Sequence, residues 1–456
     1  MYDFIVNYVP LVYEMQIQKN NITWYFNEVY EYGQFANGDY WVVGNPVVIN
    51  YINPPSIYIG ARIINGSMIN PDPTVGVQGY DSSCVMAYSA GTNVALNLSS
   101  VNPLILTPGS SLISSISIIL PGAETQLSDA EILTVLSAAP DDGSFRPPYC
   151  GADKTIEHNV SQLNYTLLRT LAPVPGTPDI DAVAAHFARP WIDHYGGFEN
   201  GFIHPAHNMP TYGREISRAV GIASLMLHLD FSIAEKEELL IHFVQLGIDN
   251  YGCVANGVQW ENDGGHNAGR KWPILFAGLV LGDGDMSSIG NRSGDYLYEV
   301  SGHGAGNPPS DYIHFQEDDQ TYYVVQADVD RTHDYNPYEG YTPPQYTTAH
   351  LGMPEWGIEH SSHPSLDNPV WTARYRQCCT AASWTGWVLA ALMMEDLAGA
   401  KTLWNHDVLF DYQDRYMAIA NGDLDPFGYS VPEEEEGARS LDAFPTDMWD
   451  EYRSDY

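Results

Sequence analysis

The sequence changes character at residues 172–178, where the run Ala-Pro-Val-Pro-Gly-Thr-Pro contains three prolines. Before this run, stretches of β-branched and aromatic residues alternate with Gly, Pro and Asn, whereas after it apolar residues recur at helical spacing. Proline stiffens the backbone and lacks an N–H group, so such a run separates two elements. Because 456 residues suffice for two domains, we expect an α+β protein with a β-rich region at residues 1–170 and an all-α region at residues 175–425.

The β-rich region is expected to be an antiparallel β-sandwich. Its candidate strands are rich in Val, Ile, Leu and Tyr, and turn residues separate them at intervals typical of two packed sheets. These strands are residues 40–43, 46–52, 56–59, 93–98, 103–106 and 111–120. Tyr30, Tyr32, Tyr40 and Trp41 form an aromatic set that fits either the core or a ligand-binding face.

The all-α region carries several helix-start signals. Thr177 is a candidate N-cap with Pro178 at the first helical position, Ser232 and Glu235 form a capping-box pattern, and Asn405 is a candidate cap of a later helix. The expected helices are residues 178–194, 213–229, 232–246, 271–281, 377–398 and 405–421.

Two further segments follow a different pattern. Residues 283–372 are rich in Gly, Pro, Tyr and Asp, and we expect hairpins and loops there that lie across one end of the helical region, with a strand at residues 321–326. Residues 426–456 are expected to be an acidic tail whose residues 447–452 dock on the body of the protein.

The charge balance excludes some classes of partner. Lys and Arg number 19 against 57 Asp and Glu, which gives a net charge of −38. Such a surface repels nucleic acid, and no apolar run is long enough to predict a membrane span. The acidity is typical of an extracellular or periplasmic protein, and we expect this localisation. The first residues lack the features of a secretory signal, so we expect that the leader is absent from this sequence.

The five cysteines show no metal-ligand spacing, and no disulfide framework is expected in a chain of this length. Cys378 and Cys379 are adjacent at the start of an apolar helix. They are interpreted as buried small hydrophobes.

Three short segments combine cations with His, Asn or Tyr, although the chain as a whole is acidic. They are residues 204–215, 263–271 and 374–376, each at a predicted junction between a loop and a helix. On an acidic surface they would together form a local positive pocket that holds an anionic group beside a proton donor or acceptor. The candidate catalytic residues are Tyr375, His266, His207, Asn208 and Tyr212, and the candidate substrate-binding residues are Arg214, Arg270, Lys271, Arg374, Arg376 and His204.

This mixture of residues fits β-elimination from a uronic acid. The reaction needs a base for the proton next to the carboxylate, a group that neutralises the carboxylate and an acid for the leaving oxygen. Arg374 and Arg376 flank Tyr375 and would make that tyrosine easier to ionise. The chemistry requires no cofactor.

Each segment also has a structural interpretation. His207 and Asn208 can cap a helix, and His266 can bridge two helices through hydrogen bonds. Arg374 and Arg376 can pair with acidic neighbours such as Glu355 or Glu359.

A β-rich domain joined to a helical domain, with Asn, His, Tyr and Arg at loop-to-helix junctions, resembles the polysaccharide lyases built on an α/α toroid, such as alginate lyases and heparinase-like enzymes. The resemblance is architectural and covers residues 175–425. It implies that Asn208 and His207 neutralise the substrate carboxylate, that His266 and Tyr375 act as the acid/base pair with Arg376 beside them, and that the substrate is an anionic polysaccharide.

Two alternatives stay open. A glycoside hydrolase would need a pair of carboxylates, and Glu261, Asp263 and residues 317–319 supply candidates. The acidic residues 317–319, and Asp283 with Asp285, also leave calcium binding open. The second alternative is a non-catalytic extracellular protein that binds carbohydrate or takes part in an assembly.

Overall fold

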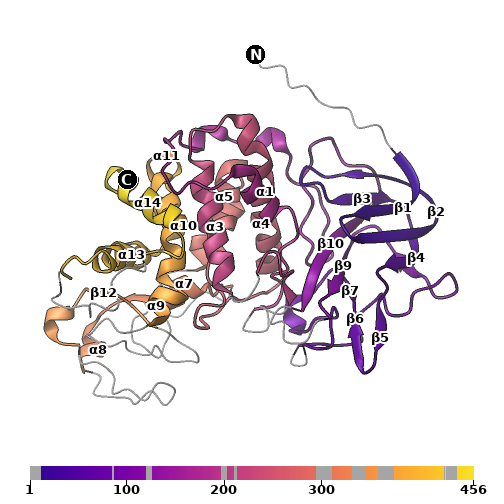
Figure 1. The fold of residues 1–456 in the computed structure, drawn as a ribbon, viewed down its shortest axis with the longest axis horizontal. Coiled ribbons are helices and arrows are strands. Elements are labelled where there is room, and N and C mark those ends of the chain that lie inside the picture. Colours follow the sequence, from indigo (N-terminus) through magenta and orange to yellow (C-terminus); the bar gives the residue numbers. More distant parts are fainter. Residues whose placement is uncertain are drawn as a thin grey trace.

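The computed structural model describes residues 12–84, 87–119, 126–196, 203–209, 213–293, 311–330, 346–357, 374–425, 427 and 439–456. A sheet-rich N-terminal region and a helical C-terminal region lie side by side along the long axis of the molecule (Figure 1). The expected α+β class is therefore confirmed. Among the described residues, no helix has the length and apolar character needed to cross a membrane.

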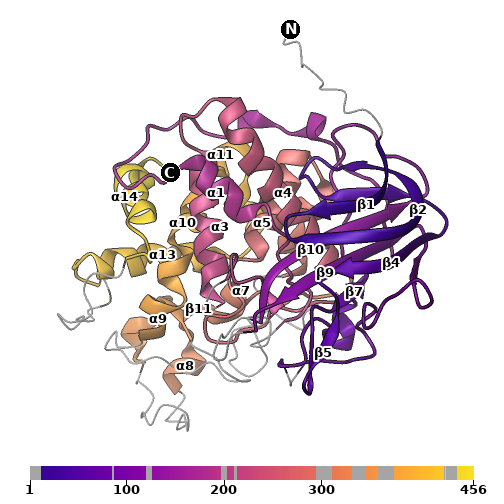
Figure 2. The same cartoon turned by 45° about the vertical axis from the view of Figure 1, so that its right-hand side comes forward.

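The N-terminal strands form one curled mixed sheet (Figure 2). Its strands are β1 Val12–Lys19, β2 Ile22–Gln34, β3 Tyr40–Val43, β4 Val47–Asn53, β7 Ser67–Ile69, β8 Leu104–Leu106, β9 Ser110–Ser117 and β10 Leu127–Leu136. The order is β7-β9-β10-β3-β2-β4-β8, and β1 pairs with β2. Only the β10–β3 pairing within this sheet is parallel. A separate hairpin joins β5 Ile57–Ile59 to β6 Arg62–Ile64.

The strand predictions correspond to β3, β4, β5, β8 and β9, but residues 93–98 were predicted wrongly, because turns and isolated bridges occupy them. β1, β2 and β10 were not predicted. In β10 the reason is visible, since this strand buries Asp129 and Glu131, which lie 2.9 Å from Arg189 and Lys19 respectively. Buried charged residues whose partners are far away in the sequence interrupt the apolar pattern by which a strand is predicted.

The two regions share part of their core. On one side of the sheet, Trp24, Val42 and Leu133 pack in a cluster confined to the N-terminal region. On the other side, Ile113 and Ile132 belong to the large cluster that continues through the helices. Alternate side chains of β10 therefore contribute to two different cores, because neighbouring side chains of a strand point to opposite faces of the sheet.

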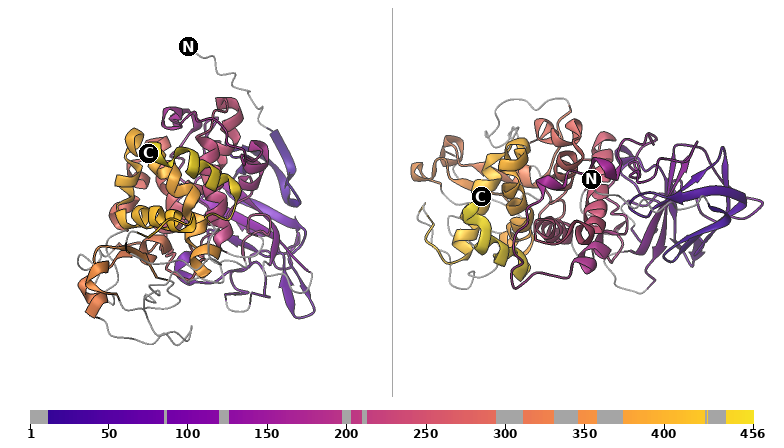
Figure 3. Two further views of the ribbon diagram at one scale, coloured as in Figure 1. Left: turned by 60° about the vertical axis from the view of Figure 1, so that its left-hand side comes forward. Right: turned by 90° about the horizontal axis from the view of Figure 1, so that it is seen from above.

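The helical region is built from α1 Ile180–Phe187, α3 Arg214–Leu227, α4 Ile233–Ala255, α5 Lys271–Leu281, α10 Ala381–Met393, α13 Asp407–Ala420 and α14 Ala443–Tyr452. Shorter helices are α6 Gly284–Ser287, α7 Gln316–Gln320, α8 Gln326–Asp330, α9 Arg374–Cys378, α11 Glu395–Ala398 and α12 Ala400–Trp404, and one hairpin pairs β11 Thr321–Tyr323 with β12 Pro354–Trp356. Seen from above, these helices group apart from the sheet (Figure 3).

Local signals place several helix ends. The Ser232–Glu235 capping box is present at α4, and α5 has the predicted bounds. Thr177 is not the cap of α1, because its hydroxyl donates back to Val174 O at 2.7 Å, while Asp179 accepts from Ala182 N at 2.9 Å. The N-cap of α13 is His406 rather than Asn405.

A buried group of charges, which we call the boundary cluster, joins the two regions. Arg146 lies 2.5 Å from Asp39 in the sheet region and 2.5 Å from Asp249 on α4. Lys19 pairs with Asp39 and with Glu131. Because Arg146 is only 1% exposed, its two carboxylate partners supply the neutralisation that water would give at the surface.

The C-terminal residues 439–456 pack on the helical region. Phe444, Met448 and Trp449 of α14 are buried in the large core, and the hydroxyl of Tyr452 donates to Ala172 O at 2.8 Å. The end of the chain therefore contacts the Pro-rich segment that separates the two regions.

Candidate active site at one end of the helices

Two of the three segments selected from the sequence contact each other, and both contact Cys378 or Cys379, which directly follow the third segment. A Cβ on Gly213 would lie 2.2 Å from the carbonyl oxygen of His266, and a Cβ on Gly265 would lie 2.3 Å from the carbonyl oxygen of Cys379. The guanidinium of Arg214 donates to Cys378 O at 2.7 Å. We call residues 213–214, 263–271, 314–320, 354–357 and 374–380 the loop end. Its elements α7, α9 and β12 lie at one end of the long helices (Figure 1).

The loop before α5 is held by the side chain of Gln316 on α7. The Gln316 amide donates to Gly264 O at 2.9 Å and accepts from Asn267 N at 2.8 Å. Gly264 and Gly269 have φ values of 59° and 88°, a left-handed conformation that glycine adopts without strain. This loop is therefore fixed by buried hydrogen bonds on both sides of His266.

Arg270 forms the first of three buried ion pairs at the loop end. Its guanidinium donates to Asp193 Oδ1 at 3.1 Å, and the same oxygen lies 3.0 Å from His204 Nε2. Arg270 also donates to the carbonyl oxygens of His266 and Ala268, both at 2.9 Å. Arg270 thus ties the segment around Asp193 to the His266 loop.

Lys271 closes the second pair at the first residue of α5. Its Nζ lies 2.5 Å from Asp318 Oδ2 and donates to Trp404 O at 2.8 Å. The indole of Trp404 donates to the other oxygen of Asp318, also at 2.8 Å. Both oxygens of this carboxylate are therefore engaged.

Arg376 closes the third pair. Its Nη1 donates to Glu355 Oε1 at 2.8 Å and to the hydroxyl of Tyr412 at 3.0 Å. Burial alone would raise the pKa of Glu355, but Arg376 and Arg415 outweigh burial and lower it. The structural interpretation of Arg376, a bridge to Glu355, is confirmed.

These pairs correct the expectation of an open positive pocket. Five of the predicted site residues are 0% exposed, namely His204, Asn208, Arg270, Lys271 and Arg376. Asn208 uses its amide to donate to Pro190 O at 3.2 Å. A charge in a low-dielectric interior needs a counter-charge, so the three cations hold the loops together in this conformation instead of reaching a substrate.

Of the remaining predicted residues, three are at least partly exposed, and the side chains of the other three lie outside the described residues. His207 is exposed, while Arg214 and His266 are half-buried. Arg374 and Tyr375 belong to α9, but their side chains lie outside the described part of the structure, as does Tyr212 altogether. The roles of these six residues stay predictions.

His207 lies next to another histidine. Its ring centroid lies 5.2 Å from that of His186, the last-turn histidine of α1. Burial, aided by His207 and Arg218, lowers the pKa of His186 to about 4. His186 is therefore neutral at physiological pH, a residue that the sequence analysis did not single out.

Glu317 is the most perturbed carboxyl of the loop end. It is 0% exposed, its Oε2 accepts from Gly269 N at 3.3 Å, and its Oε1 has no hydrogen-bond partner among the described residues. Burial, reinforced by the neighbouring Asp318, raises the pKa of Glu317 to about 8. A carboxylic acid that keeps its proton at neutral pH is typical of functional sites.

The acidic residues considered for calcium have separate partners. Asp318 pairs with Lys271, Asp319 lies 3.0 Å from His314 Nδ1, and Asp283 caps α6 by accepting from Asp285 N and Met286 N. Within the described parts of the chain, no three His, Cys, Asp or Glu side chains are grouped as a metal site would require.

A disulfide bond joins the adjacent residues Cys378 and Cys379. This corrects their interpretation as free buried hydrophobes. Cys378 is half-buried, and the Arg214 guanidinium lies 3.8 Å from Cys379 Sγ. The bonded pair therefore follows the third segment along the chain and contacts the other two through Arg214 and Gly265.

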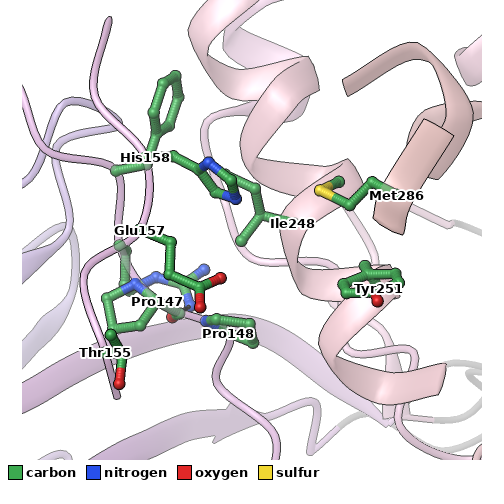
Figure 4. A pocket seen from close by; sticks show the side chains of 10 residues that line it. Pro147, Pro148, Thr155, Glu157, His158, Ile248, Tyr251 and Met286 are labelled. Carbon is green, nitrogen blue, oxygen red and sulfur yellow. Dashed lines mark hydrogen bonds between the residues drawn. The ribbon is translucent and has the colours of Figure 1, made fainter. Parts of the chain in front are cut away.

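A pocket between the N-terminal region and α4 lies elsewhere (Figure 4). Pro148, His158, Ile248, Tyr251 and Met286 are among its lining residues. The predicted site residues that the structure describes do not line this pocket.

Comparison with protein-family models, with curated proteins and with solved structures finds no match to this chain.

Proposed function

We propose that the chain is a polysaccharide lyase that cleaves a uronic-acid-containing polysaccharide by β-elimination at the loop end. The observations that support this proposal most directly are the contacts of Gly213 with His266 and of Gly265 with Cys379. They bring the half-buried Arg214 and His266 beside α9, the helix that includes Tyr375. The α/α toroid implied by the resemblance and the two-sheet sandwich expected from the spacing of the turns belong to the same proposal.

The proposal assigns one role each to Arg214, His266 and Tyr375. Arg214 neutralises the substrate carboxylate, because a guanidinium matches the planar geometry of a carboxylate. His266 removes the proton from the carbon next to that carboxylate. As the carbon–oxygen bond breaks, a double bond forms in the uronate ring and the leaving oxygen takes a proton from Tyr375.

Tyr375 receives the acid role for an electrostatic reason. Arg376 lies 2.8 Å from Glu355, so its positive charge is already balanced. A tyrosine hydroxyl that keeps its proton can deliver it to a departing oxygen. The buried ion pairs of Arg270, Lys271 and Arg376 act as supports that hold the loops in register.

A glycoside hydrolase is the second candidate. The raised pKa of Glu317, about 8, supports it, because burial keeps this carboxyl protonated as a general acid requires. Glu317 is buried in this conformation, so the hydrolase would need the loop end to open.

One assay separates the candidates. The purified chain is incubated with a panel of uronate-containing and neutral polysaccharides while the ultraviolet absorbance of unsaturated uronate and the release of reducing ends are followed together. The lyase gives both signals, the hydrolase gives reducing ends without the absorbance, and a non-catalytic binding protein gives neither. Reducing ends alone, or no signal on any uronate polymer, would contradict the lyase proposal.

A further inference from the structure

Two buried thiols lie close together at the contact between the two regions. Cys150 follows the last strand of the sheet, and Cys253 is on α4. Their Sγ atoms are 3.0 Å apart, and the residues are 1% and 0% exposed. A disulfide bond needs about 2.0 Å between the sulfur atoms, so the gap is only about 1 Å longer than the bond.

The backbone around Cys150 is held against one face of α4. The Gln245 side chain exchanges two hydrogen bonds of 3.0 Å with the backbone of Arg146, and Asp249 pairs with the Arg146 guanidinium. Further along the helix, a Cβ on Gly252 would lie 2.1 Å from Pro148 Cβ. Contacts at positions 245, 249 and 252 keep this segment next to Cys253.

Contacts after Cys150 fix the segment on its other side. A Cβ on Gly151 would lie 2.3 Å from the side-chain oxygen of Asn256. The ammonium of Lys154 donates to the carbonyl oxygens of Cys150 at 3.1 Å and of Gly151 at 2.6 Å. The two cysteines are therefore held together by their neighbours on both sides.

We propose that Cys150 and Cys253 form a disulfide bond in the mature protein, and that this bond ties the segment after the sheet to α4. With the Cys378–Cys379 disulfide it accounts for four of the five cysteines, and Cys84 is the remaining thiol. The bond closes a loop between residues 103 positions apart. It belongs to an oxidising compartment, where structural disulfides persist.

The bond forms by thiol–disulfide exchange with an oxidant that carries a disulfide bond, such as glutathione disulfide or an oxidised disulfide oxidoreductase. The thiolate of one cysteine attacks the oxidant and makes a mixed disulfide, which releases one reduced sulfur. The second cysteine thiolate then attacks the cysteine sulfur of the mixed disulfide and releases the other. Two cysteine thiols are oxidised, the oxidant becomes two thiols, and these take up the two protons.

The burial of both sulfur atoms determines at which stage of folding the disulfide bond can form. An oxidant cannot reach a residue that is 0% or 1% exposed, so the exchange takes place before the two regions close on each other. A chain that has folded in the reduced state should therefore resist later oxidation at these cysteines.

The test is a disulfide map of the full chain produced in an oxidising compartment. The protein is denatured without reductant in the presence of an alkylating reagent, then digested and analysed by mass spectrometry. We expect a peptide pair cross-linked through Cys150 and Cys253, and alkylation of Cys84 alone. Alkylation of both Cys150 and Cys253, or a link from either of them to Cys84, would overturn the proposal.

A second measurement uses variants. The Cys150→Ser/Cys253→Ser protein should unfold at lower denaturant than the non-reduced wild type. After full reduction of the unfolded chain and refolding under reducing conditions, the advantage of wild type over the double variant should shrink to the cost of burying two hydroxyl groups. The control Cys84→Ser should differ from wild type by the same amount before and after reduction. An advantage of wild type over the double variant that is equally large before and after reduction would contradict the bond, and the map decides the matter if the double variant does not fold.

Discussion

The boundary cluster and the loop end both bury charged side chains, but they differ in what stays open to solvent. In the boundary cluster, Arg146, Asp39 and Asp249 are almost completely buried and contact one another. At the loop end, equally buried pairs such as Lys271–Asp318 occur together with His266 and Arg214, which remain half-buried. The comparison shows that burial of an ion pair does not mark a site by itself, since the partly exposed neighbours decide where chemistry can occur.

One carboxyl group from each place, Asp39 in the boundary cluster and Glu317 at the loop end, has its pKa shifted in the opposite direction from the other. Burial would raise the pKa of Asp39, but Lys19 and Arg146 outweigh it and lower the value to about 2. Glu317 has Asp318 as its charged neighbour, and Lys271 contacts Asp318 instead, so burial and repulsion raise the pKa of Glu317 to about 8. Asp39 is balanced by its two cations, whereas Glu317 keeps its proton at neutral pH.

The largest effect is expected from Tyr375→Phe. Loss of the hydroxyl removes the proposed acid, so turnover of the uronate polymer should fall below detection while thermal stability stays that of wild type. The matched control is Tyr51→Phe, which removes a hydroxyl from a tyrosine that is 39% exposed on the sheet. Activity of Tyr375→Phe equal to that of the control would remove Tyr375 from the mechanism.

His266→Ala should lower kcat by at least about a hundredfold, the usual contribution of a positioned proton-transfer group. We expect the fold to persist, because Arg270 donates to the backbone carbonyl oxygen of His266 and the backbone N–H of His266 donates to Asp263 O, and alanine keeps both bonds. Initial rates on the same polymer measure the effect, with His158→Ala as the control on the pocket of Figure 4. Equal rates in the two variants would argue that His266 is structural.

Arg146→Met should act on stability and leave catalysis alone. It leaves Asp39 and Asp249 buried without this cation, which costs about 3–5 kcal/mol in comparable buried pairs. Urea unfolding measures the cost, and kcat per folded molecule should not change. Arg453→Met is the control, because Arg453 and Asp414 form a partly exposed pair, worth about 0–1 kcal/mol. A loss in Arg146→Met no larger than in this control would break the comparison.

Glu317→Gln should change the response of stability to alkaline pH. The pKa of Glu317 is raised from 4.5 to about 8, so its contribution is present below pH 4.5 and is lost as pH rises through about 8. Relative to Glu317→Gln, wild type should lose about 3 kcal/mol between pH 4.5 and pH 7. Unfolding curves across this range test the sign, with the exposed Glu237→Gln as the control. Parallel pH curves for wild type and Glu317→Gln would be inconsistent with a protonated Glu317.

Asp39→Asn should show the opposite pH dependence and the smallest effect. The pKa of Asp39 is lowered from 3.8 to about 2, so its stabilisation is present above pH 3.8 and is lost as pH falls through about 2. Wild type should exceed Asp39→Asn by about 2 kcal/mol near neutral pH, and this difference should shrink on acidification. A difference that stays constant down to pH 2 would mean that Asp39 is not held ionised by its two cations.

Much of the helical framework could be predicted from local signals. The capping box at Ser232 and the apolar run of α5 require only neighbouring residues, and both were predicted. The disulfide of Cys378 and Cys379 was missed, because adjacent cysteines carry no spacing signal that distinguishes a bond from two buried thiols. β10 was missed because its buried Asp129 and Glu131 look like loop residues until their partners are known.

The candidate site was predictable only as a set of segments. Their mixture of Arg, His, Asn and Tyr selected the stretches around Arg214, His266 and Arg376, which lie in contact. The sequence analysis assigned too many of their cations to the substrate, since a list of residues does not reveal which cations have carboxylate partners. Glu317 appeared only as one of several acidic residues, because its raised pKa depends on burial and on Asp318.

By itself, the sequence determined the change from strands to helices near residue 172 and the ends of helices such as α5, because capping, proline and apolar spacing act over a few residues. Only the tertiary structure decided which charges are balanced. Arg270 meets Asp193 across 77 positions and Lys271 meets Asp318 across 47. The energy of such a pair depends on the water that folding removes from around it, and no local pattern records that quantity.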